Sequence, residues 1–128
     1  MDRLGVQFVE RVARYARGGS YERRMEKYRK YLKFLIFVGE RFGPEDIRNI
    51  QPYHVAAFAR HLREAGRSET TIDICFSIIR WWHGRIPWPK YDIPENGILK
   101  ELEVRLDDKD YREAIKNRYR AEGPGRSL

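Results

Sequence analysis

The sequence of 128 residues has little cysteine, few amides and no long apolar run, and each shortage excludes a class of protein. Cys75 is the single cysteine, which excludes an internal disulfide framework and a cysteine-based zinc site. No apolar run approaches the roughly 20 residues that a membrane-spanning helix needs, and the first residues lack the pattern of a signal peptide. We therefore expect a cytoplasmic protein without a membrane partner. Scarce Asn and Gln beside many charges favour a heat-adapted source.

Charged residues are unusually frequent in the sequence, and basic residues outnumber acidic ones. Charged residues make up 35% of the sequence, against about a quarter in an average domain, and the net charge is +7. Nearly all of it lies in residues 1–33, which hold ten basic and four acidic residues. Clustered positive charge attracts a polyanion, so we expect double-stranded DNA as the partner. A solvated basic face without a partner is the alternative.

Apolar residues recur at a spacing near 3.6 throughout, which predicts an all-α fold. Capping and helix-ending residues divide the chain into four main helices. The first ends at Gly18-Gly19, the second runs from Ser20 to about Arg41, the third lies between Pro52 and Gly66, and the fourth lies between Ser68 and Gly84.

The C-terminal third is divided by its prolines. Residues 85–94 contain three of them and are expected to be an irregular connection, followed by a short helix carrying Ile98, Leu99 and Leu102. We predict a helical domain of residues 1–105, a polar C-terminal helix within 106–121 and a flexible tail of 122–128. Self-association through the C-terminal helices is a further expectation.

The apolar stripes give the expected core. Leu4, Phe8, Val12 and Tyr15 form it on the first helix, Met25, Tyr28, Leu32, Leu35 and Ile36 on the second, Val55, Phe58, Ala59 and Leu62 on the third, and Ile72, Cys75, Phe76, Ile79, Trp82 and His83 on the fourth. Phe34 and Phe37 fall on the opposite side of the second helix, so its second half is expected to lie between two neighbours.

An ordered series of anchor residues covers about residues 4–105. Its anchors are Tyr28, Leu32 and Leu35; Ile50, Val55, Phe58, Leu62 and Gly66; and, as the most specific part, Ser68, Thr71, Ile72, Phe76, Ser77, Ile79, Arg80 and His83. This series resembles the N-terminal core-binding domain, or SAM-like domain, of tyrosine recombinases (phage integrases). Arg24, where the family commonly has Thr, and the proline-rich 85–94 segment depart from the family pattern.

The resemblance implies a bundle of two crossed helical hairpins whose second and fourth helices face the major groove of duplex DNA. In complete recombinases a separate domain holds the Arg, Lys, His and Tyr residues that attack the phosphate. Tyr111 and Tyr119 do not lie in the Gly-x-Arg or His-x-x-Arg sequence context that this chemistry requires. The resemblance therefore implies DNA binding without catalysis, and no cofactor.

Two sets of residues are candidates for DNA contact. Basic side chains one turn apart on a helix can follow a phosphate backbone, and hydroxyl and guanidinium groups can contact base edges. The phosphate set is Arg23, Arg24, Lys27, Lys30 and Lys33, and the groove set is Thr70, Ser77 and Arg80. Arg80 could equally pair with Asp73 or Glu69 on its own helix.

Other chemically suggestive residues are expected to be structural. Phe34, Phe37, Trp81 and Trp82 lie at helical spacing among aliphatic residues and are expected in the core or in an interface. His54, His61 and His83 lack the further ligands that a zinc site requires, so no metal site is expected.

Three functions remain open at this level. The first is a DNA-binding module of the core-binding type, from an integrase or another mobile element. The second is a viral coat or chromatin-like protein, associated with a virion or nucleoid, that wraps DNA without sequence preference. The third is a helical adaptor for other proteins, without affinity for DNA.

Overall fold

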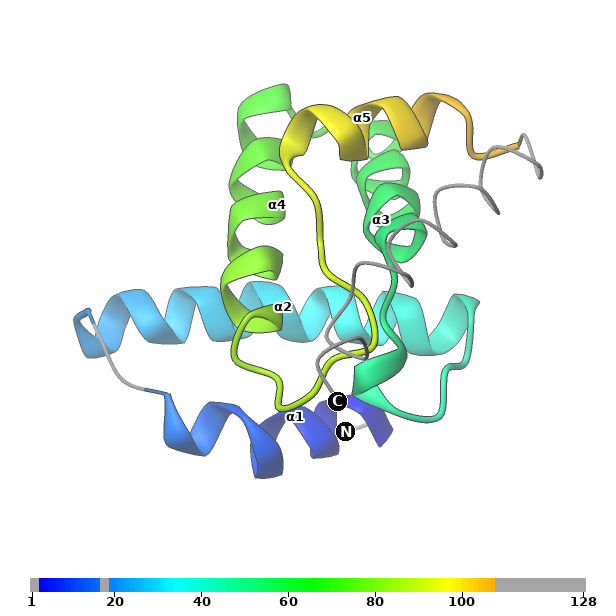
Figure 1. The fold of residues 1–128 in the computed structure, drawn as a ribbon. Helices are drawn as coiled ribbons and strands as arrows, with labels where there is room; N and C mark the ends of the chain where they lie inside the picture. Colours follow the sequence, from blue (N-terminus) through cyan, green and yellow to red (C-terminus); the bar gives the residue numbers. More distant parts are fainter. Residues whose placement is uncertain (1–2, 17–18, 108–128) are drawn as a thin grey trace.

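The computed structural model describes residues 3–16 and 19–107, and this part of the chain is built from helices without strands (Figure 1). The elements are α1 (Arg3–Arg11), a 3-10 turn (Ala13–Tyr15), α2 (Tyr21–Arg41), a second 3-10 turn (Ile47–Asn49), α3 (Pro52–Glu64), α4 (Glu69–His83) and α5 (Asn96–Val104). The predicted all-α bundle is confirmed. The polar helix and tail predicted in 106–121 and 122–128 lie, from residue 108 onward, outside the described residues.

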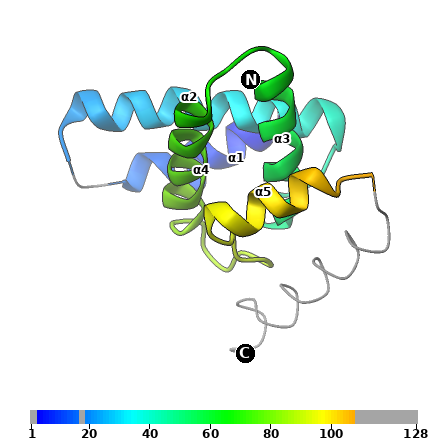
Figure 2. The ribbon, with the colours of Figure 1, turned by 90° about the horizontal axis from the view of Figure 1, so that it is seen from above.

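The helices form two crossed hairpins. α1 and α2 run side by side in opposite directions, and the α3 and α4 pair stands across α2 (Figure 1). α5 lies across α3 and α4 at the end away from α1, as Figure 2 shows from above. No helix in the described part of the chain is long and apolar enough to cross a membrane.

The ends of α2, α3 and α4 lie where the sequence predicts them, whereas α1 ends at Arg11 and not at the predicted Gly18-Gly19. Ser20 and Ser68 cap α2 and α4, each hydroxyl oxygen accepting a hydrogen bond of 3.2 Å from the backbone N–H three residues later. Gly43 follows α2 with φ at +59°, and Gly66 follows α3 with φ at +83°. Glycine adopts this left-handed conformation without the steric cost of a side chain, so both helices end there.

An aromatic cluster joins α1, α2 and α4. Phe8, Tyr31 and Trp82 are buried, and the Phe8 ring centre lies 4.8 Å from each of the other two. Both contacts have the edge-to-face geometry that aromatic quadrupoles favour. This cluster holds one hairpin against the other.

Two residues of the predicted core, one on α2 and one just after α1, are exposed to solvent. On α2, Ile36 is 46% exposed, whereas Tyr31 and Val38 are fully buried, because α1 and the α3–α4 hairpin cover two different faces of the helix. The prediction that the second half of α2 lies between neighbours is confirmed by the burial of Phe34 and Phe37. Tyr15 is 65% exposed because α1 ends at Arg11 and the following 3-10 turn breaks the 3.6-residue period.

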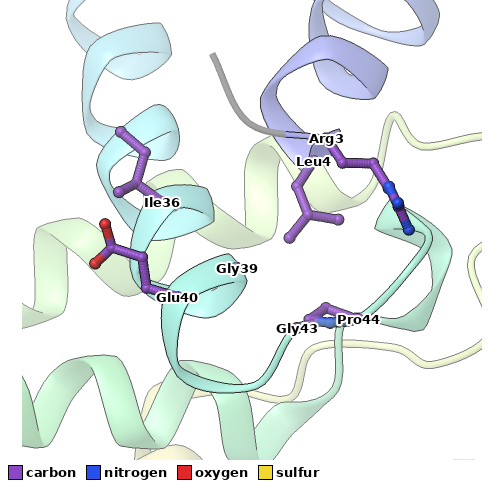
Figure 3. Close-up of a pocket in the computed structure, with 7 residues that line it drawn as sticks. All are labelled: Arg3, Leu4, Ile36, Gly39, Glu40, Gly43 and Pro44. Carbon is purple, nitrogen blue, oxygen red and sulfur yellow. The ribbon is translucent and has the colours of Figure 1, made fainter.

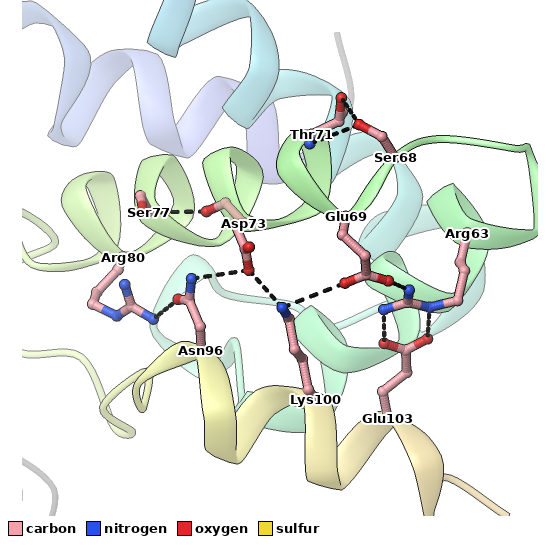
Figure 4. A network of polar contacts seen from close by, with 10 residues as sticks. All are labelled: Arg63, Ser68, Glu69, Thr71, Asp73, Ser77, Arg80, Asn96, Lys100 and Glu103. Carbon is pink, nitrogen blue, oxygen red and sulfur yellow. Dashed lines mark hydrogen bonds and ion pairs between the residues drawn. The ribbon is translucent and has the colours of Figure 1, made fainter.

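A polar network fastens α5 to the α3–α4 hairpin (Figure 4). The Arg63 guanidinium donates two hydrogen bonds, of 2.8 and 2.9 Å, to the carboxylate of the buried Glu103, and it also pairs with Glu69. Lys100 lies 3.3 Å from Glu69 and 2.8 Å from Asp73. The Glu103 carboxylate raises the pKa of Arg63 above its ordinary value.

The segment 85–94 is irregular, as predicted, and is held by backbone contacts. The Nε2 of the buried His83 donates a hydrogen bond of 2.5 Å to the Tyr91 carbonyl, and the Lys90 N–H donates one of 3.0 Å to the Arg48 carbonyl. A carbonyl only accepts, so His83 carries a proton on Nε2. Burial lowers the pKa of His83 below its ordinary value of 6.5.

Removing the Arg63 guanidinium tests the polar network. Arg63→Ala leaves the buried Glu103 carboxylate without its bidentate partner, and we expect the free energy of unfolding to fall by about 1–3 kcal/mol. Urea denaturation measures the loss, with the exposed Arg67, changed to Ala, as the control. A loss no larger than that of the control would contradict a structural role for this pair.

Acid should weaken the fold through His83. The unfolded chain takes up a proton near pH 6.5, but the folded protein resists it, so stability falls as the pH drops below about 6.5. His83→Gln keeps an N–H donor for Tyr91 but does not titrate. We expect urea midpoints of the native protein to fall between about pH 6.5 and 5, and those of the variant to fall less across this window. Equal pH dependence of both would disprove this assignment.

Candidate nucleic-acid interface

A groove of about 480 Å³ runs between the first half of α2 and the outer side of α4. Arg23, Glu26 and Lys27 line it from α2, and Thr70, Asp73, Ile74, Ser77 and Ile78 line it from α4. Four of the eight predicted site residues, Arg23, Lys27, Thr70 and Ser77, therefore meet at one groove, although about 50 residues separate the two segments in the sequence.

The acidic residues of the groove have cationic partners. Glu26 pairs with Lys30 at 3.2 Å, and Asp73 pairs with Lys100 at 2.8 Å, which lowers the pKa of Asp73. Among the described residues, neither Arg23 nor Lys27 forms an ion pair. The groove therefore carries positive charge that is not neutralised locally.

The Trp81 ring contacts two cationic side chains, one of which, Lys27, also lines this groove. The Lys27 ammonium lies 4.3 Å from its ring centre, and the Arg85 guanidinium lies 3.4 Å from it and donates a hydrogen bond of 2.7 Å to the Trp81 carbonyl. Such contacts are favourable because the ring face is electron-rich. Sequence reasoning missed this arrangement because no local pattern relates Lys27 to residues 81 and 85. The expectation that Trp82 is a core residue is confirmed.

Lys30 and Lys33 lie on the α4 side of α2. Burial raises the pKa of the Cys75 thiol, on α4, and the charges of these two lysines oppose that rise. Cys75 is half-buried, so its predicted place inside the core is wrong.

Arg24 is placed elsewhere. Its Nη1 donates a hydrogen bond of 2.8 Å to the Gly19 carbonyl, and the side chain lines a separate cavity beside Met25, Tyr28 and Trp82. Helical geometry is the reason, since adjacent residues point about 100° apart around the axis. Arg24 therefore does not share the groove with Arg23 and Lys27.

Arg80 is engaged inside the protein, which argues against its predicted contact with bases. Its Nε and Nη2 donate hydrogen bonds of 3.2 and 2.8 Å to the Pro94 carbonyl, and Nη2 also donates one of 2.7 Å to Asn96 (Figure 4). Burial lowers the pKa of Arg80 from its ordinary value. The side chain fastens the 85–94 segment and the start of α5, and it pairs with neither Asp73 nor Glu69.

A second depression, of about 600 Å³, lies between the start of α1 and the second half of α2 (Figure 3). Leu4, Ile36 and Pro44 give it apolar walls, and its charged groups are Arg3 and Glu40. Because these charges have opposite signs, this depression does not attract a polyanion as the α2–α4 groove does.

No group of three or more potential metal ligands occurs among residues 3–16 and 19–107. The chain matches no protein-family model, and comparison with curated proteins and with solved structures finds no match. The resemblance to recombinase core-binding domains therefore stays a prediction from the sequence.

The internal hydrogen bonds of Arg80 predict that its removal lowers the stability of the fold but not the affinity for DNA. Arg80→Ala leaves the Pro94 carbonyl and the Asn96 side chain without their donor, and we expect the free energy of unfolding to fall by about 1–3 kcal/mol. Affinity for duplex DNA, measured where the variant remains folded, should stay within about twofold of the native protein, because no phosphate contact is lost. Normal stability with a selective loss of affinity for one DNA sequence would restore the base-reading role.

Proposed function

We propose that residues 4–105 form a module that binds double-stranded DNA through the groove between α2 and α4. The observation that carries the proposal is the meeting of Arg23 and Lys27 with Thr70 and Ser77 at one groove whose acidic residues already have partners. Lys30 and Lys33 extend the basic side of α2 beyond it. The resemblance to core-binding domains, in which the second and fourth helices face DNA, supports the same surface.

In this proposal α2 supplies the phosphate contacts. Arg23 and Lys27 are four residues apart, about 6 Å along a helix, so both can contact one DNA strand. Phosphate contacts hold the module in place without reading sequence. Thr70 and Ser77 then face the DNA from α4; the Ser77 hydroxyl donates to the Asp73 carbonyl at 3.2 Å, which leaves its oxygen free to accept from a base or a bridging water.

The proposed module binds DNA without cutting it. His54 and His83 are buried, and each has a backbone partner: His54 accepts from the Gln51 N–H at 3.0 Å, and His83 donates to the Tyr91 carbonyl. Both rings therefore stabilise the fold by hydrogen bonding to the backbone. The resemblance also places the catalytic residues of recombinases in a different domain.

A DNA-wrapping protein without sequence preference is the second candidate, and the engagement of Arg80 favours it. Without that guanidinium, and with Asp73 already paired to Lys100, the α4 side of the groove offers two hydroxyls and the apolar Ile74 and Ile78. These groups are a weak basis for telling base pairs apart. In-vitro selection from random duplexes separates the two candidates. A reading module returns an enriched sequence, whereas a wrapping protein returns none.

Salt titration tests the proposed contact. Contact with four to six phosphates gives a log–log slope of roughly −4 to −5 for affinity against salt. Arg23→Ala and Lys27→Ala should each weaken binding to every duplex and make the slope about one unit shallower. The control is Arg41→Ala, at the far end of the same helix, which should leave the slope unchanged. Affinity that does not depend on salt, or an equal effect of all three variants, would overturn the proposal.

A further inference from the structure

A second basic cleft lies beside the α2–α4 groove. It has a volume of about 570 Å³ and is lined by Arg11, Val12, Tyr15, Ala16, Arg85 and Pro87, from the end of α1, the 3-10 turn region that follows it and the start of the 85–94 segment. The volume falls in the range of roughly 300–1,000 Å³ that is typical of small-ligand sites. Both charged groups in the lining are guanidinium groups, so the cleft favours an anion.

The aromatic ring of this cleft is exposed to solvent. Tyr15 is 65% exposed, and the Arg14 guanidinium lies 5.4 Å from the centre of its ring. An exposed aromatic face beside cations is the combination on which proteins stack the bases of single-stranded nucleic acids. The guanidinium groups can then meet the phosphates on either side of a stacked base.

Arg85 connects the cleft to the proposed duplex site. It lines the cleft, and its guanidinium also lies against Trp81, whose ring holds Lys27 of the α2–α4 groove. Cationic groups thus continue from the groove, across Trp81, into the cleft. Arg11 pairs with Asp46 at 3.2 Å through Nη1, but its side chain remains about half exposed and keeps further donors.

We propose that this cleft binds an unpaired nucleotide at the end of the bound duplex, with its base on Tyr15 and its phosphate at Arg85 and Arg11. A base inside a duplex is covered on both faces by its neighbours, whereas an unpaired base offers a free face on which an aromatic residue in a cleft can stack. The preferred ligand is then a duplex with a single-stranded extension. This inference rests on the proposed function, since the duplex part must occupy the α2–α4 groove.

Three DNA ligands isolate the stacking contact by fluorescence anisotropy. They are a blunt duplex, the same duplex with a short thymidine extension, and the same duplex with an abasic extension of equal charge. We expect the thymidine extension to raise affinity about fivefold or more over the blunt duplex, and the abasic extension to raise it much less. Both extensions add the same phosphates, so the difference between them reports the base alone.

Three variants assign that difference to the cleft. Tyr15→Ala should abolish the preference for thymidine over abasic extensions, and Tyr15→Phe should keep it because the ring remains. Tyr21→Ala is the matched control, since Tyr21 is 69% exposed and lies outside the cleft, and it should keep the preference.

The outcomes separate this inference from the function on which it rests. Equal affinity for the blunt and thymidine-extended duplexes overturns the inference and leaves duplex binding intact. A preference that survives Tyr15→Ala, or that the abasic extension matches, also overturns it. Failure to bind any duplex at low salt overturns the proposed function, and this inference with it.

Discussion

The packing of Trp82 against Phe8 and Tyr31 is the contact on which the rest of the arrangement depends. It joins α4 to both helices of the first hairpin, which fixes how α4 crosses α2. Because Trp81 is the preceding residue, its ring is directed about 100° around the helix from that of Trp82 and meets Lys27 and Arg85. The same crossing opens the groove in which Arg23 and Lys27 lie beside Thr70 and Ser77.

Local chemistry made most of the helices predictable. Ser20, Ser68, Gly43 and Gly66 act within one helical turn, so the sequence alone indicates where α2, α3 and α4 begin or end. The buried face of α2 was less predictable. The prediction of a single buried stripe assumes that one helix packs against α2. Helices instead pack against two sides of α2, and Ile36 lies on neither covered face.

For the candidate DNA-binding site, the sequence predicted which residues carry suitable side chains but not which of these side chains bind other parts of the protein. Clustered charge and helical spacing identified Arg23 and Lys27, whereas the hydrogen bonds of Arg80 to Pro94 and Asn96 depend on how an irregular segment folds back. The pairing of Asp73 with Lys100, on α5, is equally non-local. Whether a charged side chain is available to a ligand thus depends on tertiary contacts that periodicity does not encode.

The central claim is that duplex DNA lies on the α2–α4 face. Backbone amide chemical shifts, followed by ¹H–¹⁵N NMR as a blunt duplex is added at low salt, test it most directly. The account predicts that the largest changes fall in residues 20–33 and 68–81, with little change on α5 and at the far end of α2. Changes centred on α3 and α5, or none at saturating DNA, would contradict it.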